Sequence, residues 1–194
     1  MTKIKEYFTS VSQIIDNLRV EEDKIKKITN NTIIKTNEKN KKIFVIGNGG
    51  SAADADHFAG ELICTFDNKK RKPSEAYSLN QNYIAMTAWS NDFSYETYYE
   101  RCLKAYSNPG DVLLCLTTSG GSKIKKQTKN IVKAIEYAKK NKIFIISLTG
   151  RTGGFAKRNS HLNININSKK TSYIQEAHMS ILHCICEQLE NEVN

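Results

Sequence analysis

Residues 43–51 read IFVIGNGGS, an unbroken apolar run that stops at a glycine-rich turn. A short apolar run bounded by glycine is typical of a strand that is buried on both faces of a sheet. Comparable runs occur at 112–116 and 143–148, and weaker ones at 76–79 and 162–166, with helical patterns between them. Strands that alternate with helices predict crossover connections, and therefore an α/β fold whose parallel sheet lies between helices.

Residues 1–40 precede this sheet and carry a helical pattern. Apolar side chains recur there at three- and four-residue steps, which predicts an amphipathic helix. They are Ile4, Phe8, Val11, Ile14, Ile15 and Leu18, and a second helix is expected to carry Ile25, Ile28, Ile33 and Ile34. Because no linker rich in Gly, Pro or Ser divides the chain, we predict a single domain over 1–194, with a helical arm at 1–40 and an α/β core at 41–194.

Composition excludes several classes of protein. Hydrophobic residues make up 39% of the 194 and charged residues 25%, which is ordinary for a globular domain. No apolar run reaches the 18 residues of a transmembrane helix, and the N-terminus lacks the layout of a secretory signal, so a cytoplasmic protein is expected. The five cysteines are odd in number and lack Cys-x-x-Cys pairs, which favours reduced thiols in or near the core.

Positive charge is concentrated in one part of the chain. The net charge is +9, and residues 119–170 hold 13 basic residues against one acid, Glu136. The basic residues are Lys123, Lys125, Lys126, Lys129, Lys133, Lys139, Lys140, Lys142, Arg151, Lys157, Arg158, Lys169 and Lys170. Such a field attracts a phosphorylated metabolite, a nucleic acid or an acidic membrane surface, although a solvated helix face explains much of it. Nucleic acid is disfavoured, because no helix-turn-helix, zinc-finger or RNA-stacking signature is present.

Two turns follow predicted strands, where ligands bind in an open parallel sheet. In the first, at 47–51, Gly49 and Gly50 allow a ligand to approach the backbone, and Ser51 is expected to cap the following helix. The second, TTSGGS at 117–122, offers hydroxyl and amide donors before a long helix, a combination suited to phosphate. The first turn lacks the glycine spacing of a dinucleotide site and the Gly-Lys-Ser/Thr of a P-loop. Together they predict a polar, phosphate-bearing ligand.

A third group of polar residues falls on two predicted helices. His57 and Glu61 are four residues apart and share a helix face, while Gln175 and His183 are eight apart on the last helix. These four side chains could form a four-coordinate zinc site if the fold brings the helices together. Taken singly, a histidine on a helix is more often a surface or hydrogen-bonded residue, which is our expectation for His178.

The chain resembles the sugar isomerase (SIS) domain of the phosphoheptose isomerase family. The resemblance covers nearly the whole chain and is carried by GNGGSAADADHFAGE at 47–61, Asn91-Asp92, TTSGGS at 117–122 and QEAHMSILH at 175–183. It implies a three-layer flavodoxin-like fold with a five-stranded parallel sheet, and a homotetramer whose active sites lie at subunit interfaces. It also implies one zinc ion per subunit. The implied reaction converts D-sedoheptulose 7-phosphate to D-glycero-D-manno-heptose 7-phosphate, the first step toward activated heptose for lipopolysaccharide or capsule.

The resemblance also implies roles for single residues. Phosphate-binding hydroxyls would be those of Ser51, Thr117, Thr118, Ser119 and Ser122, and sugar-contacting residues Asn48, Gly49, Gly50, Asn91 and Asp92. Zinc ligands would be His57, Glu61, Gln175 and His183, with Glu61 and Gln175 also at the substrate. Glu61 and His183 would act as general base and general acid. Three positions depart from the family pattern: Thr117 replaces a common Ser, Gly121 a frequent Asn, and Ser172 an Asp that some members have.

Three other functions remain open at this point. One is a non-catalytic SIS-domain protein, such as one that binds the bacterial replication initiator, and another is the sugar-phosphate-sensing domain of a regulator. The presence of both Glu61 and His183 favours an enzyme over the first, and the absence of a DNA-binding unit before the sheet disfavours the second. The third, an isomerase of another phosphosugar, is kept open by the departures at Gly121 and Ser172.

Overall fold

The computed structural model describes residues 2–34, 37, 39–124 and 128–191. At its centre is a parallel sheet of five strands in the order β2-β1-β3-β4-β5. The strands are β1 (Ile43–Gly47), β2 (Ala76–Ser78), β3 (Val112–Thr117), β4 (Phe144–Gly150) and β5 (Leu162–Ile166). Every strand predicted from an apolar run is present, and the order is that of flavodoxin-like folds. The predicted fold class is confirmed.

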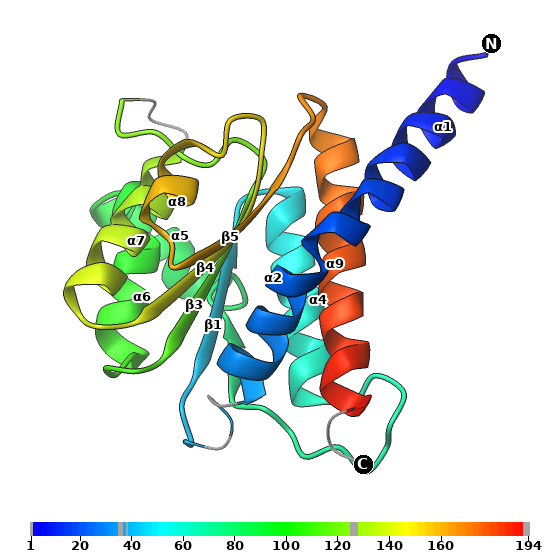
Figure 1. Cartoon of the computed structure of the whole chain (residues 1–194). Helices are drawn as coiled ribbons and strands as arrows, with labels where there is room; N and C mark the ends of the chain where they lie inside the picture. The colour runs from blue at the N-terminus through cyan, green and yellow to red at the C-terminus, as the bar shows by residue number, and fades with distance from the viewer. Residues whose placement is uncertain (1, 35–36, 38, 125–127, 192–194) are drawn as a thin grey trace.

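Helices cover both faces of the sheet, which makes three layers (Figure 1). On one face pack α2 (Glu22–Ile28), α4 (Gly50–Ile63) and α9 (Thr171–Asn191), and on the other α6 (Tyr98–Tyr106), α7 (Lys129–Lys140) and α8 (Gly154–Asn159). Side chains of β1 alternate between the two cores: Val45 packs with the first group of helices, and Phe44 and Ile46 pack with the second. Burial on both sides is why the strands read as unbroken apolar runs.

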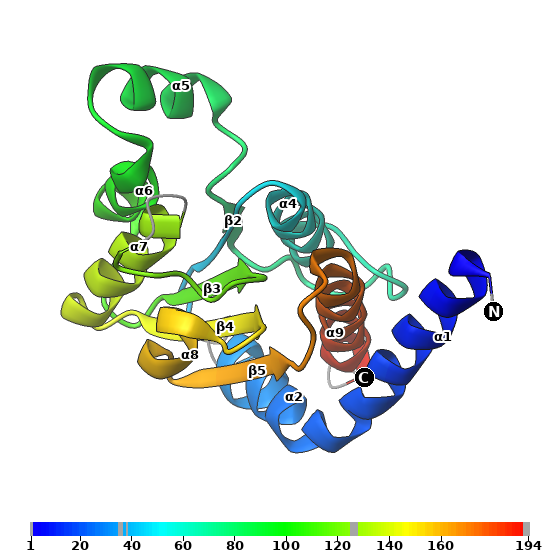
Figure 2. The same cartoon turned by 90° about the horizontal axis from the view of Figure 1, so that it is seen from above.

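The N-terminal arm is helical but only partly packed. It consists of α1 (Lys3–Asp16), η1 (Asn17–Glu21), α2 and η2 (Thr29–Ile34). Ile25, Ile28 and Ile33 are buried as predicted, whereas the side chain of Ile34 lies outside the described part. The whole of α1 is described and buries none of its residues, and Ile4 and Phe8 are 71% and 65% exposed. Figures 1 and 2 show α1 projecting past α9, so the front of its apolar stripe has no cover within the described chain.

A second projection is formed by α5 (Tyr83–Asp92), which precedes the short helix η3 (Tyr95–Thr97). Figure 2 shows α5 standing away from the sheet at the end of an extended connection from β2. None of its residues is buried, and Tyr83 and Ile84 are 70% and 66% exposed.

The predictions about the cysteines and about membrane-spanning helices are met in most respects. All five cysteines lie in the described residues and are free; Cys102, Cys115 and Cys186 are buried and Cys184 is partly buried. Cys64 is exposed, because it follows the last residue of α4 at the start of a loop. Among the described residues, no helix is both long and apolar enough to cross a bilayer.

A junction of four glycines joins the loops that follow β3 and β4. Gly120, Gly121, Gly153 and Gly154 all have positive φ. The first turn of α8 is tied to the loop after β3, because the Phe155 and Ala156 N–H groups donate to the carbonyls of Gly121 and Gly120 at 3.1 and 2.7 Å. A Cβ at Gly120 would lie 2.0 Å from the Gly153 carbonyl oxygen. The close approach of the two loops therefore requires glycine there.

Replacing Gly120 with Ala should lower the free energy of unfolding by about 2 kcal/mol or more, because φ is +75° and the new Cβ would meet backbone. The matched control is Gly60→Ala in α4, where a Cβ would meet nothing within 4 Å. Helix propensity should make that variant more stable by roughly 0.5–1 kcal/mol. Denaturant unfolding measures both changes, and equal effects of the two substitutions would contradict this account of the junction.

Candidate active site

The first predicted turn closes tightly over the start of α4. Gly49 has a φ of +58° and is the N-cap of the helix, which begins at Gly50. A Cβ at Gly47 would lie 2.1 Å from the Ser51 carbonyl oxygen, so glycine is also required there. The prediction that Ser51 caps the helix is wrong, because the chain turns into the helix two residues earlier. Ser51 lies inside the first turn instead, 2% exposed.

Asn48 in this turn is held by residues from the layer of α6 and α7. Its Nδ2 donates to Asn130 Oδ1 at 3.0 Å, and Asn130 Nδ2 donates back to Asn48 Oδ1 at 2.7 Å. The hydroxyls of Tyr95 and Tyr99 donate to the same Asn48 oxygen at 2.9 and 3.3 Å. This network fixes the Asn48 amide, and its other members were not among the residues predicted for the site.

The sequence contained one signal for Asn130. It precedes Ala134 and Ala138 at four-residue steps, and both alanines lie on the buried stripe of α7. Asn130 is itself only 2% exposed. A buried polar side chain needs hydrogen-bond partners, so an Asn on an apolar helix stripe indicates a polar contact inside the fold.

The second predicted turn, at 117–122, lies against α8 rather than at the start of a long helix. That helix, α7, begins only at Lys129. Residues 123 and 124 are not helical, so the predicted helix does not follow the turn directly, and positions 125–127 lie outside the described residues. Thr117 is buried and its Oγ1 accepts a hydrogen bond from the Gly120 N–H at 3.2 Å. Thr118, Ser119 and Ser122 are partly exposed at the carboxyl edge of the sheet, where a phosphate would be bound.

The adjacent helices α4 and α9 bring three of the predicted metal and catalytic residues together. Both views show these helices side by side (Figures 1 and 2). His57 Nε2 lies 3.0 Å from Glu61 Oε1, within hydrogen-bonding distance. The rings of His57 and His183 are 5.2 Å apart between centroids, and the ring of Phe66 is 5.6 Å from that of His183. An imidazole pair and a carboxylate thus share one partly exposed site.

Gln175 lies at the other end of the same helix pair. Its Nε2 is 3.5 Å from the Ser51 hydroxyl, and a Cβ added to Gly50 would come within 2.4 Å of that nitrogen. Glycine at position 50 therefore leaves the space that the Gln175 amide occupies. This contact lies about 9 Å along α4 from His57, given the rise of a helix. The structure thus places Gln175 beside the glycine turn, at the opposite end of the helix pair from the histidines.

Asn91 and Asp92 are the predicted residues that the structure does not bring to this site. They end the projecting helix α5, and the Asn91 amide donates to the Asp92 carboxylate at 2.9 Å. Figure 2 shows α5 well apart from α4 and α9.

The donor set around His57 fits a zinc ion by its chemistry, since two imidazoles, a carboxylate and an amide oxygen are suitable zinc ligands. Among the residues that the structure describes, no three His, Cys, Asp or Glu side chains already converge on one point. His57 and Glu61 instead bond to one another.

His178 is not part of this set: it is fully buried, and its Nε2 lies 3.3 Å from the Thr149 carbonyl oxygen. That is the hydrogen-bonded role expected for it.

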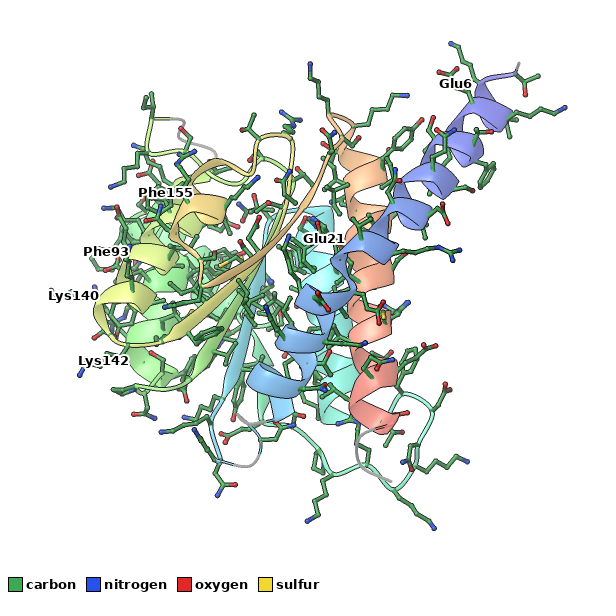
Figure 3. The ribbon with its side chains drawn as sticks, viewed as in Figure 1. Glu6, Glu21, Phe93, Lys140, Lys142 and Phe155 are labelled. Carbon is green, nitrogen blue, oxygen red and sulfur yellow. The ribbon has the colours of Figure 1, made fainter. Side chains whose placement is uncertain are left out.

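The basic segment does not act as one surface. Lys139, Lys140 and Lys142 connect the end of α7 to the start of β4, at the amino edge of the sheet and away from the site. Figure 3 shows Lys140 and Lys142 at the outer rim of this layer. Nearer the site, Lys123 Nζ lies 2.8 Å from Glu136 and Lys129 Nζ lies 3.6 Å from Glu96. Two further predicted members, at positions 125 and 126, fall outside the described residues.

Asp54 is a carboxyl group that the sequence did not single out. It lies on α4 between Ser51 and His57, half-buried, and its Oδ2 has no hydrogen-bond partner within the described residues. Burial, together with the nearby charge of Glu176, raises the pKa of Asp54 to about 6, although His57 acts in the opposite direction. The charged form of Asp54 therefore destabilises the fold at neutral pH.

Comparison with known proteins places the chain among phosphosugar enzymes. A family model described as "SIS domain" matches residues 6–150. The "Probable phosphoheptose isomerase" of Thermoplasma acidophilum is 41% identical over 151 residues, 78% of this chain and 79% of the relative. The phosphoheptose isomerase of Crocosphaera subtropica is 39% identical over 152 residues, 78% and 74% of the two chains. A solved phosphoheptose isomerase from Francisella tularensis has a TM-score of 0.89 at 28% identity, covering 98% of this chain and 100% of that one.

Substituting Asp54 with Asn should stabilise the metal-free protein at pH 8. Because the folded pKa is raised from 3.8 to about 6, the stability that the protonated carboxyl contributes is present below pH 4 and is lost as the pH rises through 6. An amide that never ionises should therefore gain about 1 kcal/mol at pH 8, the value being reduced for half-exposure, and nothing near pH 4. Denaturant unfolding at both pH values measures this. Asp92→Asn, at an exposed position, is the control, and a gain of equal size at both pH values would contradict the assignment.

Proposed function

This chain belongs to the SIS domain family and, within it, to the phosphoheptose isomerases, and we propose that it converts sedoheptulose 7-phosphate to D-glycero-D-manno-heptose 7-phosphate. The observation that carries the proposal is the meeting of His57, Glu61 and His183 on the adjacent helices α4 and α9. Both helices begin at the carboxyl edge of the sheet, where the hydroxyl-rich turn lies. A purely binding SIS domain has no need of a base and an acid in one site, and the relatives named above are isomerases.

Substrate binding would use neutral donors. The hydroxyls of Thr118 and Ser119 lie partly exposed at the end of β3, and the N-terminus of α4 directs the positive end of its dipole to the same edge. The Gln175 amide, beside Ser51, would lie between the phosphate and the carbonyl end of the sugar. A phosphate held there fixes the distance from the substrate's far end to Glu61 and His183.

The chemistry requires a proton to leave C1 and a proton to return at C2. In this scheme the Glu61 carboxylate removes the C1 proton while His183 donates a proton to the carbonyl oxygen on C2, which forms an enediol. Glu61 then returns the proton to C2, and His183 accepts the proton of the hydroxyl on C1, which yields the aldose. Imidazole suits the oxygen steps because its ordinary pKa lies near neutrality.

We further propose that zinc binds at this site, one ion per subunit. His57, Glu61 and His183 would hold it, and Gln175 would complete the set only if its amide turns from Ser51 toward the histidines. A bound zinc ion polarises a carbonyl and stabilises negative charge on oxygen. A carboxylate bound to a metal is a weaker base than a free one, so Glu61 cannot keep both roles unchanged. Activity with and without a chelator separates these roles.

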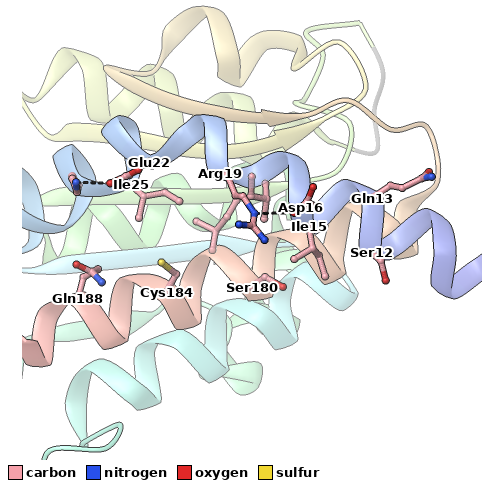
Figure 4. Close-up of a pocket in the computed structure, with 13 residues that line it drawn as sticks. Ser12, Gln13, Ile15, Asp16, Arg19, Glu22, Ile25, Ser180, Cys184 and Gln188 are labelled. Carbon is pink, nitrogen blue, oxygen red and sulfur yellow. Dashed lines mark hydrogen bonds and ion pairs between the residues drawn. The ribbon is translucent and has the colours of Figure 1, made fainter.

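A homotetramer with active sites between subunits is also part of the proposal. It is supported by the exposed apolar stripe of α1 and by a groove of about 1130 Å³ between the arm and α9. Figure 4 shows Ile15, Ile25 and Cys184 among the side chains that line this groove. The projecting α5 would carry Asn91 and Asp92 to the site of a neighbouring subunit. We place the reaction in the cytoplasm, where it would supply activated heptose for lipopolysaccharide or capsule.

Replacing Glu61 with Gln should reduce kcat for sedoheptulose 7-phosphate by on the order of a hundredfold or more, because the amide cannot accept the C1 proton. The assay incubates purified protein with the ketose phosphate, with and without chelator, and detects the aldose by chromatography. Glu187→Gln, at an exposed position of α9, is the control and should keep wild-type activity. Turnover close to wild type in Glu61→Gln would remove Glu61 from the mechanism. Turnover of another phosphosugar alone would redirect the substrate assignment.

Polar substitution of the α1 stripe should weaken the oligomer. Ile4→Ser combined with Phe8→Ser removes two exposed apolar side chains from a helix that buries nothing within its own chain. Light scattering after gel filtration should give a tetramer for the wild type and a smaller species for this variant, with far-UV circular dichroism unchanged. Tyr106→Ser, at a half-exposed position on the opposite layer, is the control and should remain tetrameric. A double variant that stays tetrameric would exclude this stripe from the contact.

A further inference from the structure

Arg71 and Glu190 form a buried ion pair that neither the mechanism nor the family motifs include. Arg71 lies in the loop after α4, and Glu190 lies in the last turn of α9. The Nε of Arg71 is 3.3 Å from Oε1 of Glu190, and the two side chains are 5% and 6% exposed. The pair thus joins the far ends of the two helices that carry the candidate catalytic residues.

The Arg71 guanidinium closes the C-terminal end of α4. Besides Glu190, it donates from Nη2 to the carbonyl oxygens of Glu61 and Cys64, and from Nη1 to that of Leu62 at 3.1 Å and that of Lys72 at 3.0 Å. All five N–H donors of the side chain are therefore used. A cation at this position also complements the negative end of the helix dipole. The last turn of α4, which includes Glu61, is held through its own backbone.

The Glu190 carboxylate binds the loop that follows α4. Its oxygens accept hydrogen bonds from the N–H groups of Phe66 at 2.8 Å and of Asp67 and Asn68 at 2.6 Å each. Burial acts to raise the pKa of Glu190, but the N–H groups and Arg71 outweigh it and hold the pKa below its ordinary value. The charged carboxylate thus fixes residues 66–68 across the end of α9.

Each residue of the ion pair is connected by contacts to one of the proposed catalytic residues. Arg71 binds the carbonyl oxygen of Glu61 directly. Glu190 binds the N–H of Phe66, whose ring lies 5.6 Å from the ring of His183 at an angle of 36°. The base and the acid are therefore supported by one ion pair, from two sides.

We propose that Arg71 and Glu190 are positioning residues for the isomerase site: they set Glu61 through its backbone carbonyl, and they set His183 through the ring of Phe66. This inference rests on the function proposed above. A buried ion pair gives little net stability over a well-packed apolar pair, but a guanidinium with five directed bonds fixes the geometry of what it binds. Displacement of a catalytic group by about 1 Å can cost on the order of a hundredfold in rate.

Two substitutions test the proposed positioning of Glu61 and His183, one at the ion pair and one at the ring of Phe66. Arg71→Lys keeps the positive charge beside Glu190 but loses the planar fork that binds the end of α4. Phe66→Leu leaves the ion pair intact and removes the ring beside His183. Each should lower kcat per folded enzyme by about tenfold or more. KM should change by less than about threefold, because the hydroxyl groups proposed to bind the phosphate lie in another loop, at 117–122. Ile135→Val, in the core on the opposite face of the sheet, controls for a general loss of stability and should keep the wild-type kcat.

A spectroscopic measurement tests the positioning of His183 independently of enzyme activity. In protein labelled with ¹³C-histidine, the ring signals of His183 should shift in both variants, since the orientation of a neighbouring ring determines them. The signals of His161, which stacks on Phe144 at 4.5 Å, should stay unchanged. Unchanged His183 signals, or a loss of kcat no larger than in Ile135→Val, would overturn the proposal. A wild-type protein that isomerises no phosphosugar would instead refute the proposed function. The shifts of the His183 signals would still test whether Arg71 and Phe66 position that ring.

Discussion

The packing of α4 against α9 is the contact on which the candidate site depends. Ala55, Ala59 and Leu62 of α4 are fully buried in the same core as Ile174 and Ile181 of α9. Each large apolar side chain buried in this way contributes roughly 1.5–3 kcal/mol, and the small alanines allow the helices to approach closely. The polar edge of the same helix pair carries His57, Glu61 and His183. The apolar faces hold the helices together, and the two imidazoles and the Glu61 carboxylate meet as a result.

The parallel sheet adds the second constraint. All five strands end at one edge, so the turns at 47–51 and 117–122 open toward the same region although the chain separates them. Glycines make both turns possible. Gly47 and Gly49 let the chain enter α4 at once, and Gly120 fits against the backbone of the loop after β4. The edge proposed to bind the phosphate is therefore a product of backbone geometry as much as of hydroxyl groups.

Charge serves different purposes in different parts of the molecule. Lys139, Lys140 and Lys142 of the basic segment lie at the amino edge of the sheet, whereas Arg151, Lys169 and Lys170 follow the carboxyl ends of β4 and β5. At either edge such charges raise the rate of encounter with anions. The charges that matter for geometry are few and buried. Arg71 and Glu190 have their hydrogen-bonding groups satisfied and tie α4, its following loop and α9 together. Asp54 is the opposite case, a half-buried carboxyl whose ionisation costs stability.

Local patterns in the sequence determined the strands, the helical arm and the pairing of His57 with Glu61, because side chains four residues apart on a helix always share a face. The capping of α4 by Gly49 and the late start of α7 depended on backbone conformations that residue types do not specify. Contacts between distant residues were decided only by the tertiary structure. Asn48 meets Asn130 across 82 residues, and Arg71 meets Glu190 across 119. No period or motif encodes such pairs, since they form only when the sheet and both helical layers have brought their elements together.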